Sequence, residues 1–232
     1  HEMNATNADE CCHLFEQSWV DRHSPITSEN MDMYLQTLLN LSIEQQVEFY
    51  EFYKKTLQAM AYLNKDQPVS HHVLKDATHY LFVEALLKVF PDASVLMLHR
   101  KPAPVAKSCL SGISFVARYY YRVRDILYSN LAARTLKWMT ISVERGNEAR
   151  YNYEKQHPDN KNFFDVQFEE FVKEPIEVVK RIYAHYGYEY SQQFEDNMKT
   201  FLQHYETFRK SKPSFRHSIE PFGMSESEIN DF

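Results

Sequence analysis

The sequence predicts a single α/β domain, residues 1–232, in which a short parallel sheet is outnumbered by helices. One almost unbroken apolar run of strand length, Ser94–His99, is typical of a strand covered on both faces in a parallel sheet. Apolar residues at helical spacing fill most of the chain around it. The 232 residues suit one large domain, and no linker or internal repeat divides them.

Composition excludes several classes of protein. With 44% hydrophobic residues the chain can bury a core, which excludes wholesale disorder. It has 4 glycines, where average usage would give about 16, and neither GxGxxG nor GxxxxGKS/T is present. The net charge of −6 disfavours nucleic acid as a partner. Three cysteines make no disulfide framework, and no apolar run has the length of a membrane span.

The first third of the chain is expected to be helical. Residues 8–20 carry a weak helical pattern, and a clearer one runs over residues 31–39. Ser42 and Gln45 have the spacing of a capping box, which predicts a helix that starts there and ends before Pro68.

The middle of the chain predicts a βαβ unit. Val69–Lys75 has the pattern of a short strand, and Thr78–Phe90 that of a helix stopped by Pro91. Ser94–His99 is the second strand, so the crossover is expected to be right-handed.

The remaining elements follow in order. After Pro102 and Pro104 the sequence predicts helix to about Gln156 with a break at Gly112, and a third strand at Asn162–Phe168. It further predicts a helix over 169–186 capped by Gly187, a last helix over 192–210, and a polar tail over 213–232.

Polar side chains follow two of these strands where ligands bind in parallel sheets, beyond the carboxyl ends. Lys75 ends the first strand, and His79 lies in the first turn of the next helix. Arg100 follows the second strand, and Ser108 comes eight residues later. A guanidinium, a hydroxyl and a helix N-terminus suit a phosphate monoester. No metal site is expected, because no cluster has metal-ligand spacing.

The order of these motifs resembles that of the sulfotransferases that use 3′-phosphoadenosine 5′-phosphosulfate. Residues 74–79 (LKDATH) are similar to the family's LKxPxH, residues 90–93 to its FPDA, and Arg100-Lys101-Pro102 with Ser108 to its RxP and serine. Similar segments follow at 165–175, 182–187 and 218–224. The sequence departs from the pattern at Ala77, where the family has proline.

This resemblance implies a P-loop-like three-layer α/β fold. It also implies transfer of a sulfuryl group from that donor to a hydroxyl or amine of a carbohydrate or small molecule. Arg100 and Ser108 would hold the donor's 3′-phosphate, Lys75 would lie near the transferred group, and His79 would contact acceptor or cofactor. Glu10 lies in an acidic pair that resembles one near the start of related domains, which makes it a candidate general base.

The family's opening strand and 5′-phosphosulfate loop have no counterpart between His1 and Asn64, a segment without glycine. We therefore expect the chain to bind the donor through its 3′-phosphate end and, by itself, to transfer nothing. Two alternatives stay open: a truncated or degenerate nucleotide-binding domain without catalysis, and a P-loop small-molecule kinase. The compartment stays open too, between the cytoplasm and, with an upstream anchor, the Golgi lumen.

Overall fold

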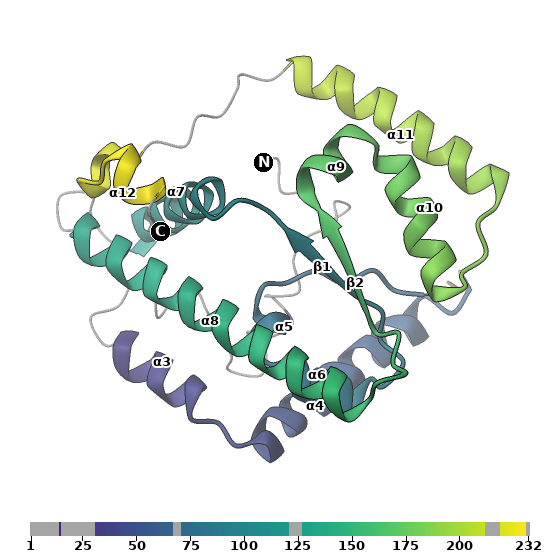
Figure 1. The fold of residues 1–232 in the computed structure, drawn as a ribbon, viewed down its shortest axis with the longest axis horizontal. Helices are drawn as coiled ribbons and strands as arrows, with labels where there is room; N and C mark the ends of the chain where they lie inside the picture. The colour runs from purple at the N-terminus through teal and green to yellow at the C-terminus, as the bar shows by residue number, and fades with distance from the viewer. Residues whose placement is uncertain (1–13, 15–30, 67–70, 121–126, 212–218, 231–232) are drawn as a thin grey trace. The chain divides into compact units, whose positions relative to one another are not determined.

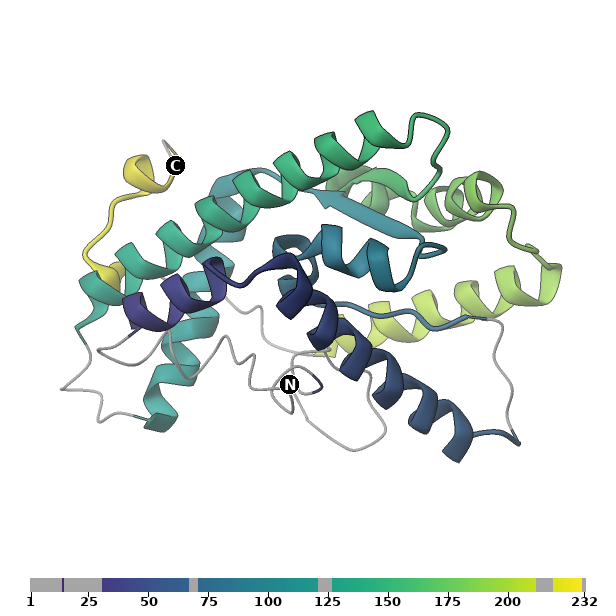
Figure 2. The same ribbon diagram turned by 90° about the horizontal axis from the view of Figure 1, so that it is seen from below.

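A computed structural model describes residues 14, 31–66, 71–120, 127–211 and 219–230 of the chain, most of them in helices (Figures 1 and 2). These residues form two compact units. Unit 1 is drawn from residues 1–91 and 112–157, and unit 2 from residues 92–111 and 158–232. Each unit is described by itself below. The helical pattern predicted over 8–20 lies outside the described residues apart from Leu14.

The elements divide between the units as follows. Unit 1 holds α3 (Met31–Leu39), α4 (Ile43–Leu63), α5 (Thr78–Leu81), α6 (Val83–Val89) and α8 (Tyr128–Gln156). Unit 2 holds β1 (Val95–His99), β2 (Phe163–Gln167), α9 (Phe168–Lys173), α10 (Pro175–Tyr186), α11 (Gln192–Ser211), the 3₁₀ turn η2 (Glu220–Phe222) and α12 (Glu226–Asn230). The helix α7 (Pro102–Tyr120) begins in unit 2 and ends in unit 1.

The predicted capping box starts α4, and its prediction is confirmed. The backbone N–H of Gln45 donates to the Ser42 hydroxyl at 3.3 Å, and the Gln45 side-chain oxygen accepts from the Ser42 N–H at 2.9 Å. The two bonds satisfy N–H groups that lack partners at a helix start. The chain turns here between α3 and α4 (Figure 2).

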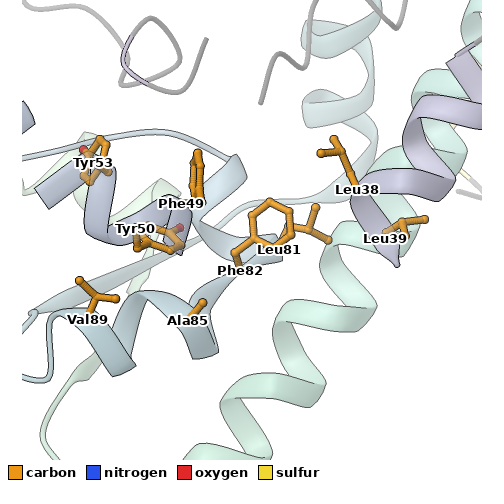
Figure 3. Packing of buried hydrophobic residues seen from close by; sticks show 9 residues of the cluster. All are labelled: Leu38, Leu39, Phe49, Tyr50, Tyr53, Leu81, Phe82, Ala85 and Val89. Carbon is orange, nitrogen blue, oxygen red and sulfur yellow. The ribbon is translucent and has the colours of Figure 1, made fainter. Parts of the chain in front are cut away.

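An aromatic and aliphatic cluster forms the core of unit 1 (Figure 3). Tyr50 of α4 lies at its centre with 0% of its surface exposed. The other members are Leu38, Leu39, Phe49, Tyr53, Leu81, Phe82, Ala85 and Val89. They come from α3, α4 and the α5–α6 segment, so the core joins this segment to α3 and α4. This contact positions the residues that lead into α5.

The strand predicted at Val69–Lys75 is wrong in its described part. Residues 71–75 have no regular secondary structure, and 85% of the Val73 surface is exposed. A strand needs a hydrogen-bonded neighbouring strand and a face that becomes buried. A strand-like pattern in the local sequence supplies neither. The predicted βαβ unit over residues 69–99 is therefore wrong as well.

Two helix boundaries also differ from those predicted. The helix expected over Thr78–Phe90 breaks at Phe82, whose φ of −120° and ψ of 29° are not helical. The Phe82 ring is 2% exposed, so its burial in the core accompanies the break. Gly112 interrupts nothing, because α7 runs through it.

Unit 2 is built on the parallel pair β1 and β2, and both predicted strands are confirmed (Figure 1). Val95 pairs with Phe163 at one end and His99 with Gln167 at the other. Val166 of β2 packs against Val178 and Ile182 of α10. The helix α10 ends at Gly187 in the left-handed conformation, φ 71°, as the sequence predicted.

The described part of the C-terminal tail, residues 219–230, buries three apolar side chains, Ile219, Phe222 and Ile229. A left-handed Gly223, φ 66°, ends the turn η2. No helix in the described ranges is both long and apolar enough to cross a membrane. The fold class is the predicted one, a short parallel sheet with a helical majority.

Candidate functional site

Arg100 and Ser108 both lie on the segment that leaves β1. Arg100 is the first residue after the strand and is exposed. The helix α7 starts two residues later at Pro102, so its N-terminal N–H groups and positive dipole end lie near Arg100 in sequence. Ala106 and Leu110 are fully buried and fix this part of α7, while Ser108 between them is half-buried. The segment therefore offers a cation, a hydroxyl and a helix N-terminus.

The guanidinium of Arg100 lies over an aromatic ring. Its central carbon lies 4.3 Å from the centre of the Phe168 ring. Because His99 pairs with Gln167, Arg100 and Phe168 are the next residues after the two paired strand ends. The register of the sheet thus brings them together.

A histidine–carboxylate pair lies at the same edge of the sheet. The Nε2 of His99 lies 2.5 Å from an Oδ of Asp165, and both side chains are about half exposed. Met97 pairs with Asp165, so His99 and Asp165 lie on one face of the sheet. The Asp165 carboxylate of the neighbouring strand is therefore engaged by His99.

Lys75 and His79 flank the start of α5 in unit 1. Lys75 is exposed. The next residue, Asp76, is buried, and its carboxylate accepts the backbone N–H of Thr78 at 2.7 Å. This bond fixes the turn between Lys75 and the helix.

His79 points into the core of unit 1 and hydrogen-bonds Tyr50, with 3.1 Å between its Nδ1 and the tyrosine hydroxyl. The two rings are stacked, and the Tyr53 ring meets the imidazole edge-on. Burial lowers the pKa of His79 to about 4, against an opposing effect of the Asp76 carboxylate. The imidazole is therefore neutral at neutral pH.

The predicted site residues divide between the two units: Arg100 and Ser108 lie on the segment after β1 in unit 2, and Lys75 and His79 lie at the start of α5 in unit 1. Glu10 lies outside the described residues. Within the described ranges, no group of three or more His, Cys, Asp or Glu side chains could hold a metal ion.

Sequence reasoning missed Phe168 and Tyr50, which contact Arg100 and His79, and Asp165, which contacts the neighbouring His99. The register of β1 against β2 would have placed Phe168 beside Arg100 and Asp165 beside His99. No local signal links Tyr50 to His79, because they lie 29 residues apart.

The fold is that of an α/β protein in which an arginine, a helix start and a serine follow a parallel strand. The profile of the Sulfotransferase family matches residues 1–192, and the chain belongs to that family. The matched region contains every candidate site residue named above. No curated protein sequence matches the chain significantly.

Two solved structures share the fold. Sulfotransferase STF1 from Mycobacterium tuberculosis H37Rv is 21% identical with a TM-score of 0.74, over 100% of this chain and 56% of that one. Sulfotransferase STF9 from Mycobacterium avium is 20% identical with a TM-score of 0.76, over 97% of this chain and 54% of that one. The chain therefore spans a little over half the length of each.

Proposed function

We propose that this protein is a sulfotransferase that uses 3′-phosphoadenosine 5′-phosphosulfate as its donor. The acceptor we propose is a hydroxyl or amine of a carbohydrate or small molecule. The observation that carries the proposal is the Arg100–Ser108 segment after β1, inside the region that matches the family. The alternative of a nucleotide-binding domain without catalysis rests on the lack of a counterpart to the 5′-phosphosulfate loop between His1 and Asn64, and no observation favours a kinase.

Arg100 and Ser108 are assigned to the 3′-phosphate of the donor. A phosphate monoester carries close to two negative charges at neutral pH and has several acceptor oxygens. The guanidinium can donate two parallel hydrogen bonds to it, and a serine hydroxyl adds a neutral donor. The N-terminus of α7 adds a favourable dipole and the backbone N–H groups of Ala103 and Val105, since Pro102 and Pro104 have none. These groups recognise the phosphate that distinguishes this donor from an ordinary adenosine 5′-nucleotide.

Lys75 is assigned to the transfer step. The acceptor oxygen or nitrogen forms a bond to sulfur while the bond from sulfur to the 5′-phosphate oxygen breaks. The leaving phosphate keeps the electron pair, and the acceptor proton goes to a base. An ammonium group offsets the charge that grows on the leaving phosphate, and such stabilisation favours the transition state over the ground state. Lys75 is exposed and follows a segment without regular structure.

The environment of His79 bears on which residue acts as the base of the transfer step. Its Nδ1 is engaged by Tyr50 and its imidazole is neutral. We therefore assign His79 first to holding the turn after Lys75, and keep contact with acceptor or cofactor as its second proposed role. Glu10 stays a candidate base on the resemblance alone.

A comparison of two nucleotides tests the proposed donor. Adenosine 3′,5′-bisphosphate and adenosine 5′-monophosphate differ only in the 3′-phosphate. We expect calorimetric titration to give at least about tenfold tighter binding of the bisphosphate, because charged hydrogen bonds contribute about 1.5–3 kcal/mol. Equal dissociation constants for the two nucleotides would contradict the proposal.

A further inference from the structure

The contact between Arg100 and Phe168 has a geometry that bears on anion binding. The 4.3 Å between the guanidinium carbon and the ring centre is well within the range of about 6 Å for a cation–π contact. The ring is half-buried at the start of α9. Phe171, one turn further along α9, packs against the cluster of Val166 and Val178. The ring is therefore carried by an element that is itself anchored to the sheet.

Stacking of this kind leaves the arginine able to bind an anion. The ring covers one side of the guanidinium, and the N–H donors that do not face the ring stay available to an anion. A carboxylate partner would occupy those donors instead. Asp165, a carboxylate of the neighbouring strand, is engaged by His99, with 2.5 Å between the His99 Nε2 and an Oδ of Asp165.

The stacking also acts on the entropy of binding. An exposed arginine has many rotamers, and ordering such a side chain on binding costs about 0.5–1.5 kcal/mol. A guanidinium that is already held against a ring loses less of this freedom when a phosphate arrives. Preorganisation of this kind increases affinity without adding a contact to the ligand.

We propose that Phe168 is a positioning residue that fixes the Arg100 guanidinium in a phosphate-binding orientation before the nucleotide binds. The inference rests on the proposed function, because the 3′-phosphate is the ligand that Arg100 receives. Phe168 acts through Arg100 and makes no contact with the phosphate. Its effect should therefore vanish when either Arg100 or the 3′-phosphate is removed.

The test compares Phe168→Leu with Phe171→Leu, a matched control that removes a ring from the same helix. Phe168→Leu should weaken binding of adenosine 3′,5′-bisphosphate about two- to fivefold, which corresponds to about 0.5–1 kcal/mol for an exposed cation–π contact. Phe171→Leu should leave that affinity within twofold of wild type, a bound of about 0.4 kcal/mol. Phe168→Tyr keeps the ring and should restore wild-type binding. Adenosine 5′-monophosphate should bind equally to all of these proteins.

Two further measurements separate a positioning role from a merely structural one. In an Arg100→Ala background, Phe168→Leu should weaken bisphosphate binding no further, because a coupled pair is not additive. In wild-type protein, the NMR resonance of the Arg100 side-chain Nε–H should be shifted upfield by the ring, and Phe168→Leu should abolish the shift. The upfield shift of the Arg100 resonance is measured on wild-type protein, so it tests the inference even if a variant folds poorly.

The outcomes distinguish the inference from the proposed function. Wild-type protein that prefers the bisphosphate, with Phe168→Leu binding it equally well, would overturn the inference alone. An unshifted Arg100 resonance would also overturn it. So would a loss of bisphosphate affinity from Phe168→Leu that is the same in the Arg100→Ala background as in wild type. Wild-type protein that does not discriminate between the two nucleotides would overturn the proposed function and the phosphate role of Phe168 with it.

Discussion

The ring of Tyr80 in α5 lies directly against the backbone of Gly146 in the middle of α8. A Cβ on Gly146 would come within 2.6 Å of the ring. The Tyr80 hydroxyl also donates a hydrogen bond to the Asn147 side chain. Only glycine allows the Tyr80 ring to come this close. The contact packs α5 against α8 and so holds the turn of Lys75 and His79 in place.

Gly146→Ala is therefore expected to destabilise unit 1. An added methyl group normally stabilises a helix by about 1 kcal/mol relative to glycine, but overpacking against a ring costs about 1–3 kcal/mol. We expect a net loss of about 1 kcal/mol in the free energy of unfolding, measured with urea. Gly112→Ala is the matched control: it is helical too, with nothing within 4 Å of its Cβ position. Gly112→Ala should be more stable than wild type. A change in unfolding free energy of the same sign in both variants would contradict the packing of Tyr80 against Gly146.

Acid should destabilise the protein through His79. Its folded pKa, about 4, lies below its ordinary value of 6.5. The unfolded chain therefore binds a proton between these values while the folded chain does not, so stability falls as pH drops from 6.5 towards 4. The loss from this residue is about 3 kcal/mol at most. His79→Gln should show a smaller decrease in unfolding free energy between pH 7 and pH 4. The same pH dependence in both proteins would exclude a buried neutral His79.

The elements that the sequence predicted correctly are those with a complete local signal. The capping box at Ser42 and Gln45 satisfies its own helix start, and Gly187 supplies the left-handed residue that ends α10. The apolar runs of β1 and β2 are long enough to be recognised as strands without knowledge of their partners. Arg100 and Ser108 are candidates because the end of β1 locates them, and their role stays a prediction.

The features that escaped prediction depend on distant contacts. Residues 71–75 have the composition of a strand but no regular structure, and Phe82 breaks a helix that its own neighbours favour. The contacts of Tyr50 with His79 and of Phe168 with Arg100 join segments 29 and 68 residues apart. Register and packing decide these contacts, and both arise only in the folded chain.

Lys75→Ala is expected to lower turnover far more than nucleotide affinity. Lys75 is assigned to charge that develops in the transition state, so its loss should reduce kcat while leaving binding in the ground state nearly unchanged. Turnover with labelled donor, measured on the full-length protein, and titration with adenosine 3′,5′-bisphosphate give the two quantities. Lys65→Ala, an exposed lysine after α4, serves as the control. An unchanged kcat would remove Lys75 from the mechanism.

The most direct measurement of the central claim is titration of adenosine 3′,5′-bisphosphate into wild type, Arg100→Ala and Lys101→Ala. The two substitutions remove one exposed cation each, from neighbouring positions after β1. If Arg100 holds the 3′-phosphate, Arg100→Ala should weaken binding by about 1.5–3 kcal/mol, whereas Lys101→Ala should change it by less than about 0.5 kcal/mol. Superimposable titration curves for wild type and Arg100→Ala would contradict the account.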